Sequence, residues 1–141
     1  MTRTEAGVKK YIYDWLKGLQ IGPVFQDRKP IDDTTKLRDK RTYIVVDFPE
    51  GIEDQGPWHY GLCRVNIGCR DKERFVADLE TLDKISAKFL DEFDKNDEEN
   101  GVSCIDVEFE DDFSDGVQNH EYQYIFDVYA QKWLDEEDDV R

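Results

Sequence analysis

The run Thr42-Tyr43-Ile44-Val45-Val46-Asp47-Phe48 decides the fold of this chain. Its β-branched and aromatic residues follow one another almost without a polar break, which is typical of a strand covered on both faces. Pro49 and Gly51 end the run, because proline lacks a backbone donor and glycine lacks a side chain to pack. The sequence therefore predicts a central strand over residues 42–48.

A second strand is predicted after a polar loop that extends to Pro57. Within residues 58–69, apolar side chains alternate on one face of the strand: Cys63, Val65, Ile67 and Cys69. The other face is partly wet and carries Tyr60, Leu62, Arg64 and Asn66. The two strands and their long loop predict a hairpin on which the rest of the chain is built.

Two helices are predicted from apolar residues at helical spacing. The first runs from about Thr4, a plausible N-cap, to Leu19, with its stop near Gly22 and Pro23. The second opens at residues 70–73 with Asp71 as the candidate N-cap and continues for about 20 residues. Its expected apolar stripe comprises Phe75, Val76, Leu79, Leu82, Ile85, Phe89, Leu90 and Phe93.

Three further strands complete the prediction. Val24 and Phe25 form a short strand at the sheet edge, and residues 102–110 and 120–130 pair as an antiparallel hairpin. In residues 102–110, one face is expected to hold Ser103, Ile105, Val107 and Phe109, and the outer face Cys104, Asp106, Glu108 and Glu110. In the last strand, one face holds Tyr122, Tyr124, Phe126 and Val128.

The predicted fold class is α+β, with a single mostly antiparallel or mixed β-sheet of about 4–5 strands and two main helices packed on it. A length of 141 residues suits one domain, assigned to residues 1–134, followed by an acidic C-terminal tail over residues 135–141. The three cysteines are expected to be buried reduced thiols, which implies a reducing compartment. The sequence contains no apolar run of about 18 residues, so we expect no transmembrane helix. Its N-terminus is polar and lacks the apolar core of a signal peptide, so we do not expect secretion.

Charge is distributed unevenly along the chain. Residues 1–90 hold 16 Lys and Arg against 15 Asp and Glu, whereas residues 91–141 hold 3 against 19. The formal net charge of −15 therefore comes from the last third of the chain. Such an asymmetry indicates an acidic face, an acidic tail, or both.

Motifs for metal binding and catalysis are incomplete. The acidic stretches that begin at Asp94 and Asp111 each miss required positions of a calcium-binding loop, and the two histidines stand apart from the cysteines. His59 and Cys63 share a strand face but lie about 13 Å apart along it, which is beyond hydrogen-bonding reach. The sequence has no phosphate-binding glycine motif. We therefore expect no enzyme activity, no metal and no cofactor.

The stretch from Gln26 to Arg41 mixes basic and acidic residues. Its basic residues suggest nucleic-acid binding, but the aspartates between them nearly cancel the local charge. We therefore do not expect specific nucleic-acid binding. A solvated loop and a docking segment for an acidic protein surface both remain open.

The layout resembles the tail-terminator (tail-completion) proteins of long-tailed bacteriophages. The matching parts are Val24-Phe25 with Pro30, Tyr43-Ile44-Val45-Val46, Leu62-Cys63-Arg64-Val65-Asn66-Ile67, Arg70-Asp71-Lys72 and Phe75-Val76-Ala77-Asp78-Leu79 with Leu82 and Ile85. The resemblance covers about residues 8–130 and is one of element order and apolar texture. The acidic C-terminal end has no counterpart in the family pattern.

The resemblance implies a non-catalytic ring, typically a homohexamer, that caps the tail tube of a phage or prophage and meets the head-completion protein. It implies a virion protein that is assembled in the host cytoplasm. Its partners would be further copies of the chain and the tail-tube protein, and it would not bind a membrane. A head-to-tail ring needs two unlike patches on each protomer. The candidate interface residues are Arg28, Lys29, Arg38, Lys40, Arg41, Glu50, Glu53, Asp54, Asp106, Glu108 and Glu110.

The loop from Pro49 to Pro57 carries acids that could face a lumen and repel DNA phosphates, or it is an ordinary solvated hairpin loop. The alternative function is a small acidic, cytoplasmic binding protein that mimics the charge of DNA and inhibits a nuclease or a DNA-binding protein. That alternative predicts a monomer or dimer whose affinity for a basic partner falls steeply with salt.

Overall fold

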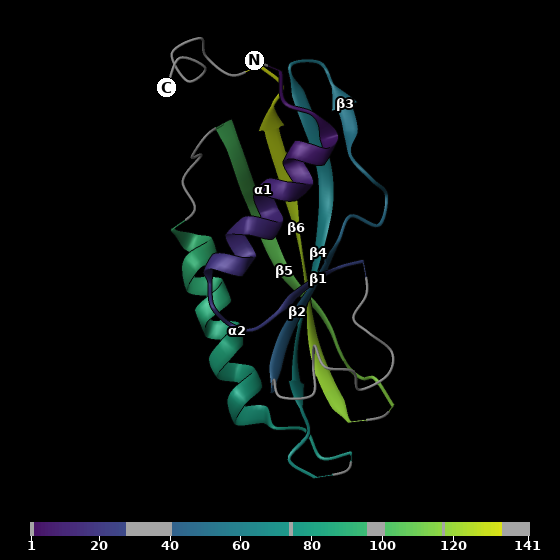
Figure 1. The fold of residues 1–141 in the computed structure, drawn as a ribbon, viewed down its shortest axis with the longest axis vertical. Coiled ribbons are helices and arrows are strands. Elements are labelled where there is room, and N and C mark those ends of the chain that lie inside the picture. The colour runs from purple at the N-terminus through teal and green to yellow at the C-terminus, as the bar shows by residue number, and fades with distance from the viewer. Residues whose placement is uncertain (1, 28–40, 74, 96–100, 117, 134–141) are drawn as a thin grey trace.

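Within the residues that the structure describes, six strands form one sheet in the order β1-β2-β4-β6-β5, and β3 pairs with the part of β4 that β2 leaves free. The computed structural model describes residues 2–27, 41–73, 75–95, 101–116 and 118–133 (Figure 1). The elements in chain order are α1 (Glu5–Gly18), β1 (Val24–Gln26), β2 (Thr42–Asp47), β3 (Glu53–Gln55), β4 (Trp58–Arg70), α2 (Leu79–Asp94), β5 (Val102–Ser114) and β6 (Asn119–Gln131). The acidic tail predicted over residues 135–141 lies outside the described residues.

The sheet is mixed, and the helices α1 and α2 pack on it, which confirms the predicted α+β class. β1 runs parallel to β2, and the other neighbouring strands are antiparallel. The sheet has six strands where four or five were expected, because β3 forms inside the predicted loop. Gly56, with a φ of 66°, and Pro57 turn the chain so that Glu53 comes opposite Tyr60.

The first helix agrees with the predicted range at both ends. The Thr4 hydroxyl accepts a hydrogen bond from the Gly7 backbone N–H at 3.0 Å, as expected of an N-cap. The helix ends at Gly18 with Leu19 as its C-cap, within one residue of the predicted end at Leu19, and Gln20 beyond it adopts a left-handed conformation with a φ of 58°.

The predicted start of the second helix is wrong. Asp78, not Asp71, caps α2, and its carboxylate accepts the Thr81 N–H at 3.2 Å. The chain before it makes a tight turn in which the Lys72 N–H binds the Val76 carbonyl at 3.0 Å and Phe75 has a φ of 63°. Phe75 and Val76 are consequently 56% and 49% exposed, although their spacing had placed them in the core stripe.

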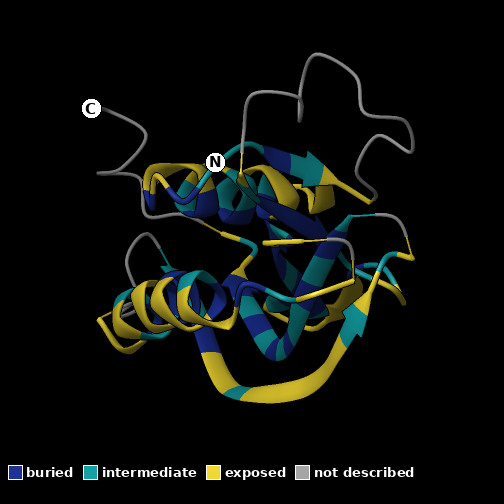
Figure 2. Ribbon diagram, turned by 90° about the horizontal axis from the view of Figure 1, so that it is seen from below, coloured by how far each residue is buried: buried dark blue, intermediate teal, exposed yellow. Residues whose placement is uncertain are grey.

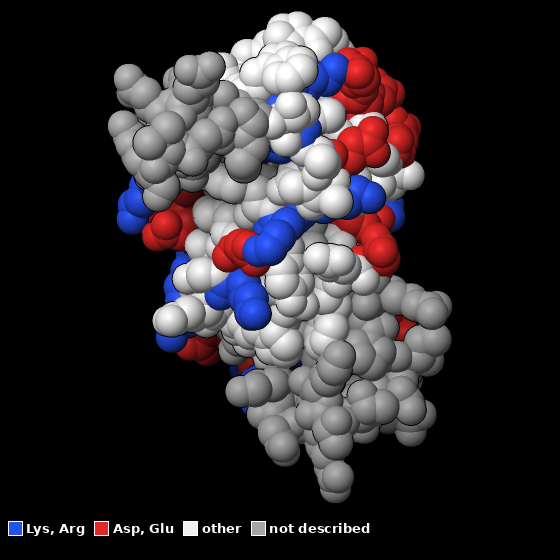
Figure 3. Space-filling view, turned by 45° about the horizontal axis from the view of Figure 1, so that its top comes forward, with Lys and Arg blue, Asp and Glu red and all other residues white. Residues whose placement is uncertain are grey.

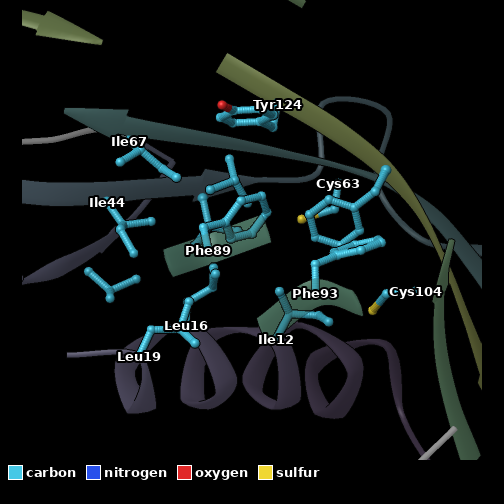
Figure 4. Close-up of a cluster of buried hydrophobic side chains, with 14 of the residues drawn as sticks. Ile12, Leu16, Leu19, Ile44, Cys63, Ile67, Phe89, Phe93, Cys104 and Tyr124 are labelled. Carbon is cyan, nitrogen blue, oxygen red and sulfur yellow. The ribbon is translucent and has the colours of Figure 1, made fainter. Parts of the chain in front are cut away.

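One face of the sheet and both helices build the main core (Figure 4). Cys63, Val65, Ile67 and Cys69 of β4 are fully buried on this face, which confirms their predicted alternation. An aromatic cluster joins the layers: Phe93 of α2 lies edge-on to Phe126 of β6 with ring centroids 5.1 Å apart, and Trp15 of α1 packs against the same ring at 6.2 Å. Leu82, Ile85 and Phe89 of the predicted α2 stripe are buried there too. Leu90 is half-buried, and Leu79, also predicted in the stripe, is 55% exposed at the start of the helix.

The predicted faces of β5 are wrong. Register shifts between Ile105 and Glu108, and between Phe109 and Asp111, interrupt the simple alternation. Cys104 is buried in the core, whereas Ile105 is 42% exposed and Phe109 is 54% exposed. The strand also continues to Ser114, through residues that had been expected to form a loop. In the last strand, Tyr124, Phe126 and Val128 share the core face as predicted.

The N-terminal residues lie beside the end of β6. The Arg3 N–H donates to the Lys132 carbonyl at 2.6 Å, and Thr2 bridges to Trp133. Among the described residues, no helix is long and apolar enough to cross a lipid bilayer.

Candidate interaction surface

The face of the sheet away from the helices is the first candidate surface, here called the open face. It carries Tyr60, Leu62, Arg64 and Asn66 of β4 and Gln123, Ile125, Asp127 and Tyr129 of β6, and every one of these side chains is half-buried. The partly wet face predicted for β4 is therefore confirmed. A mixed apolar and polar face of this kind is typical of a surface that a neighbouring protein can cover.

Two tyrosines fix the upper part of the open face. The rings of Tyr60 and Tyr129 pack with centroids 4.9 Å apart, and the Tyr60 hydroxyl donates to the Asp127 carboxylate at 2.6 Å. This hydrogen bond, helped by partial burial, raises the pKa of Tyr60 to about 12. The hydroxyl therefore stays protonated at neutral pH and holds the aromatic pair in place.

An ion pair fixes the middle of the open face. Arg64 binds the Asp47 carboxylate through two nitrogens, Nε at 3.0 Å and an Nη at 2.6 Å. The hydrogen bond to Asp47 is the main cause of the raised pKa of Arg64, and the charge of Glu110 adds to it. Paired guanidinium and carboxylate forks give fixed geometry, so this pair supports the register between β2 and β4.

A buried carboxylate lies toward the other end of the open face. Glu121 is 4% exposed and accepts hydrogen bonds from the Tyr43 hydroxyl and, at 3.2 Å, from Asn66 Nδ2. Burial, and next the charge of Glu121, raise the pKa of Tyr43. The hydroxyl remains a donor, and the carboxylate is held by fixed partners as a buried charge requires.

The arrangement nearest to a catalytic one involves three residues on neighbouring segments. His120 lies opposite Cys69 in the pairing of β4 with β6, and its Nδ1 is 2.5 Å from Asp71 Oδ1. Cys69 is fully buried and donates to the Arg70 carbonyl at 3.3 Å, and burial raises the pKa of its thiol. A nucleophilic cysteine needs an accessible thiol of lowered pKa, so the arrangement suits a structural role.

The contact of His120 with Asp71 was missed because the sequence had placed Asp71 at the N-cap of a helix. Nothing local in the sequence pairs residues 49 positions apart.

Neither acidic stretch considered for calcium forms a metal site in the described part of the chain. Asp111 and the residues after it belong to β5, and an extended strand cannot wrap its ligands around one ion. Residues 96–100 of the other stretch lie outside the described residues. Across the ranges that the structure covers, no three His, Cys, Asp or Glu side chains are grouped to hold a metal ion.

A small pocket opens between α1 and the end of β2, lined by Lys9, Gln26, Asp27, Val46, Asp47 and Phe48. The Asp47 carboxylate in this lining is already bound by Arg64.

The predicted acidic interface residues fall into two groups at the surface. Asp106, Glu108 and Glu110 are exposed on β5, and Glu50, Glu53 and Asp54 are exposed on or beside β3. Figure 3 shows acidic side chains gathered over the end of the molecule that carries β3. Asp54 pairs with Lys132, and this hydrogen bond is the main cause of its lowered pKa.

The predicted basic interface residues are placed only in part. Arg28, Lys29, Arg38 and Lys40 lie outside the described residues. Arg41, just before β2, binds the Asp78 carboxylate at the start of α2. The structure therefore brings Arg41 together with an acid that the sequence had not included in the interface, and not with the acids of β5.

The long edge strand β5 is the second candidate surface. It pairs with β6 on one side and forms the end of the sheet order. It carries five carboxylates, on Asp106, Glu108, Glu110, Asp111 and Asp112, and no Lys or Arg. In Figure 2 most of the strand is coloured as exposed and curves around the outside of the sheet.

No protein-family model matches the chain, and the comparison with curated proteins found no match.

Proposed function

We propose that this chain is a non-catalytic structural protein that forms a ring at the end of a phage or prophage tail tube, as a tail terminator at the head–tail joint. The α+β fold supports the proposal, because its element order follows the parts on which the resemblance rests: a short edge strand, two adjacent antiparallel strands and a helix that packs on them.

The observation that carries the proposal is the half-buried state of the β4 and β6 side chains on the face of the sheet away from the helices. Both helices contribute to the core on one face, and the open face keeps side chains such as Leu62 and Ile125 half-buried. A ring protomer needs different surfaces for its two neighbours and further surfaces for the tube and the head. The open face, the β5 edge and the β3 hairpin supply three surfaces of different chemistry.

The β3 hairpin suits a position near the DNA path. Glu53 and Asp54 are exposed on it, and Glu50 is exposed in the preceding turn. Carboxylates at a lumen repel DNA phosphates, so DNA would pass without adhering. In the proposed ring this hairpin faces the lumen, and the partners are further copies of the chain, the tail-tube protein and the head-completion protein in the virion.

Molar mass in solution tests the proposal. Light scattering across protein concentration and at two salt levels should show a ring, or a monomer that moves toward one as concentration rises, and electron microscopy should show closed rings of one size. A monomer at every concentration and at both salt levels contradicts assembly of the free protein.

The acidity of β5 favours a second candidate function, a binding protein that mimics the charge of DNA. Five carboxylates along one exposed strand resemble a line of phosphates in charge. This function predicts a monomer or dimer that inhibits a nuclease or displaces DNA from a basic protein at low salt and loses the effect as salt rises. A chain that assembles into rings and leaves such proteins unaffected rules it out.

A further inference from the structure

An apolar patch lies on the helix side of the molecule, where the start of α2 meets β6 and β5. It comprises Val76, Leu79, Phe109 and Tyr122 and is here called the flank patch. Leu79 and Phe109 are each more than half exposed, and Val76 is nearly half exposed. Tyr122 is half-buried between the helix and the sheet.

Side-chain contacts join the members of the flank patch. The Tyr122 hydroxyl donates to Asp83 Oδ1 at 3.2 Å, and Asp83 lies one helical turn after Leu79. The Phe109 ring lies edge-on to the Tyr122 ring with centroids 5.6 Å apart. Val76 lies three residues before Leu79, in the tight turn that precedes α2. Exposed apolar side chains that gather in this way mark a surface at which another protein binds.

Carboxylates flank the patch on two sides. Asp83 lies beside Tyr122 on α2, and Asp112 lies opposite Tyr122 in the pairing of β5 with β6, and both are exposed. Burial, and next the charge of Asp83, raise the pKa of Tyr122, and the charge of Asp112 adds to the rise. Two flank patches brought together would set carboxylates near carboxylates. The patch therefore favours a partner surface that joins apolar area with positive charge.

The outer face of α1 has this chemistry. α1 holds three lysines against two acids, whereas α2 holds two lysines against five acids. Lys10, Tyr13 and Lys17, here called the α1 stripe, follow one another at three- and four-residue steps on one side of the helix. The Lys17 ammonium lies 5.7 Å from the centroid of the Tyr13 ring. Lysine stems of this kind cover apolar area while their ammonium groups reach acids at its rim.

The positions of the two surfaces favour a second copy as the source of the α1 stripe. α1 packs on its own core through Val8, Ile12 and Leu16, so its stripe faces away from its own protomer. In Figure 1, α1 lies in the upper part of the helix layer, whereas α2 and β6 both begin at the lower end of the molecule. Two unlike surfaces at different ends of one protomer produce a head-to-tail contact that repeats from copy to copy.

We infer that the flank patch receives the α1 stripe of a second copy of this chain. In this contact Tyr13 packs on the exposed apolar side chains of the patch, and the two lysines pair with the carboxylates that flank it. The inference rests on the proposed self-association and names the two surfaces that meet in it.

Charge-reversed variants test this contact by light scattering. The patch variant carries Asp83→Lys and Asp112→Lys, and the stripe variant carries Lys10→Glu and Lys17→Glu. Matched controls make the same changes of charge at exposed positions toward the C-terminal end of α2: Asp91→Lys with Asp94→Lys, and Lys88→Glu with Lys95→Glu. Circular dichroism checks that each variant keeps the native spectrum.

The patch variant and the stripe variant should each have the mass of a monomer at concentrations where the unmodified protein and both controls assemble. An equal mixture of the two should assemble again, and so should one chain that carries all four substitutions. In both cases opposite charges face each other across the contact once more.

Leu79→Ala tests the apolar part of the contact without a change of charge, and it keeps the inference testable if a charge reversal disturbs the fold. Leu79 is exposed in the protomer, so the substitution should leave folding stability almost unchanged. The protein concentration at half-maximal assembly should rise about tenfold, because apolar area buried in the contact is lost. Assembly at an unchanged concentration would contradict the burial of Leu79 between copies.

The outcomes separate this inference from the proposed function. If the patch and stripe variants assemble as the unmodified protein does, the contact between the flank patch and α1 is refuted and ring assembly stands. If the controls dissociate as well, the net charge governs assembly and the specific contact is refuted. An unmodified chain that is always monomeric overturns both. If that monomer binds a basic DNA-binding protein and the patch variant does not, the patch has a different occupant.

Discussion

The ring of Tyr43 on β2 lies over Gly68 on β4, the residue directly opposite it in the antiparallel pair. A Cβ atom added to Gly68 would stand 2.2 Å from the ring carbon Cζ of Tyr43. Tyr43 is 1% exposed and its hydroxyl donates to Glu121, so the ring has little freedom to move aside. The glycine is therefore required by the close approach of the aromatic ring.

Gly68→Ala should destabilise the protein by about 1–3 kcal/mol, the usual cost of overpacking a well-filled site. The midpoint of urea unfolding, at an unchanged slope, measures the loss. Gly18→Ala is the matched control, because nothing lies within 4 Å of its added Cβ and alanine is favoured in a helix. Equal stability of Gly68→Ala and the unmodified protein would contradict the packing of the ring over Gly68.

Truncation of Leu82 and of Leu79, both in α2, should have very different effects on the stability of the protein. Leu82 is fully buried, and Leu82→Ala should cost about 2–5 kcal/mol through lost burial and a cavity. Leu79 is 55% exposed, so Leu79→Ala should change stability by about 0.5 kcal/mol or less. Denaturant unfolding of the two variants compares them directly, and similar losses would refute the observed start of α2.

Period-two alternation predicted the elements whose pattern is uninterrupted. The buried face of β4 and the core face of β6 follow from it, and so does the open face, since both strands are regular over their whole length. β5 was misread because its register shifts move later side chains to the other face, as Phe109 shows. A bulge leaves no clear mark in a sequence where acidic residues already alternate with apolar ones.

The start of α2 was misread because two aspartates were available as caps. Asp71 and Asp78 both precede helix-forming residues, and only tertiary contacts distinguish them. His120 binds Asp71 from β6, while Arg41 and Thr81 bind Asp78. The sequence showed that the last third of the chain is strongly acidic. It could not show that the acidic strand β5 lies at an edge of the sheet, because the order of the strands is set by contacts between distant residues.

The three cysteines should react slowly in the folded protein. Cys63, Cys69 and Cys104 are buried, and burial raises the pKa of Cys63 and of Cys69. The reactive thiolate is therefore scarce and shielded. Titration with a thiol reagent at pH 8 should be slow without denaturant and should reveal all three thiols at once in guanidinium. Rapid reaction of the native protein would contradict the burial of these residues.

Asp78 should make the stability of the protein depend on acidic pH. Its carboxylate binds the Thr81 hydroxyl at 2.8 Å and the Thr81 N–H, and it pairs with Arg41. The hydroxyl of Thr81 is the largest cause of its lowered pKa, which lies below the ordinary value of 3.8 in the folded state. A carboxylate with a lowered folded pKa stabilises the protein above its unfolded pKa, and this contribution is lost as pH falls through the folded value.

Asp78→Asn separates the charge of this residue from its capping role, because asparagine is as good an N-cap as aspartate. The variant should melt at a lower temperature than the unmodified protein at pH 6, and the difference should shrink as pH falls below about 4, where the unmodified carboxylate becomes protonated. Melting temperatures measured by circular dichroism from pH 6 to pH 2 follow both proteins. Glu80→Gln is the control, because its exposed side chain in the first turn carries the same charge without these partners. A gap between Asp78→Asn and the unmodified protein that stays constant to pH 2 would show that the carboxylate does not act through its ionised form.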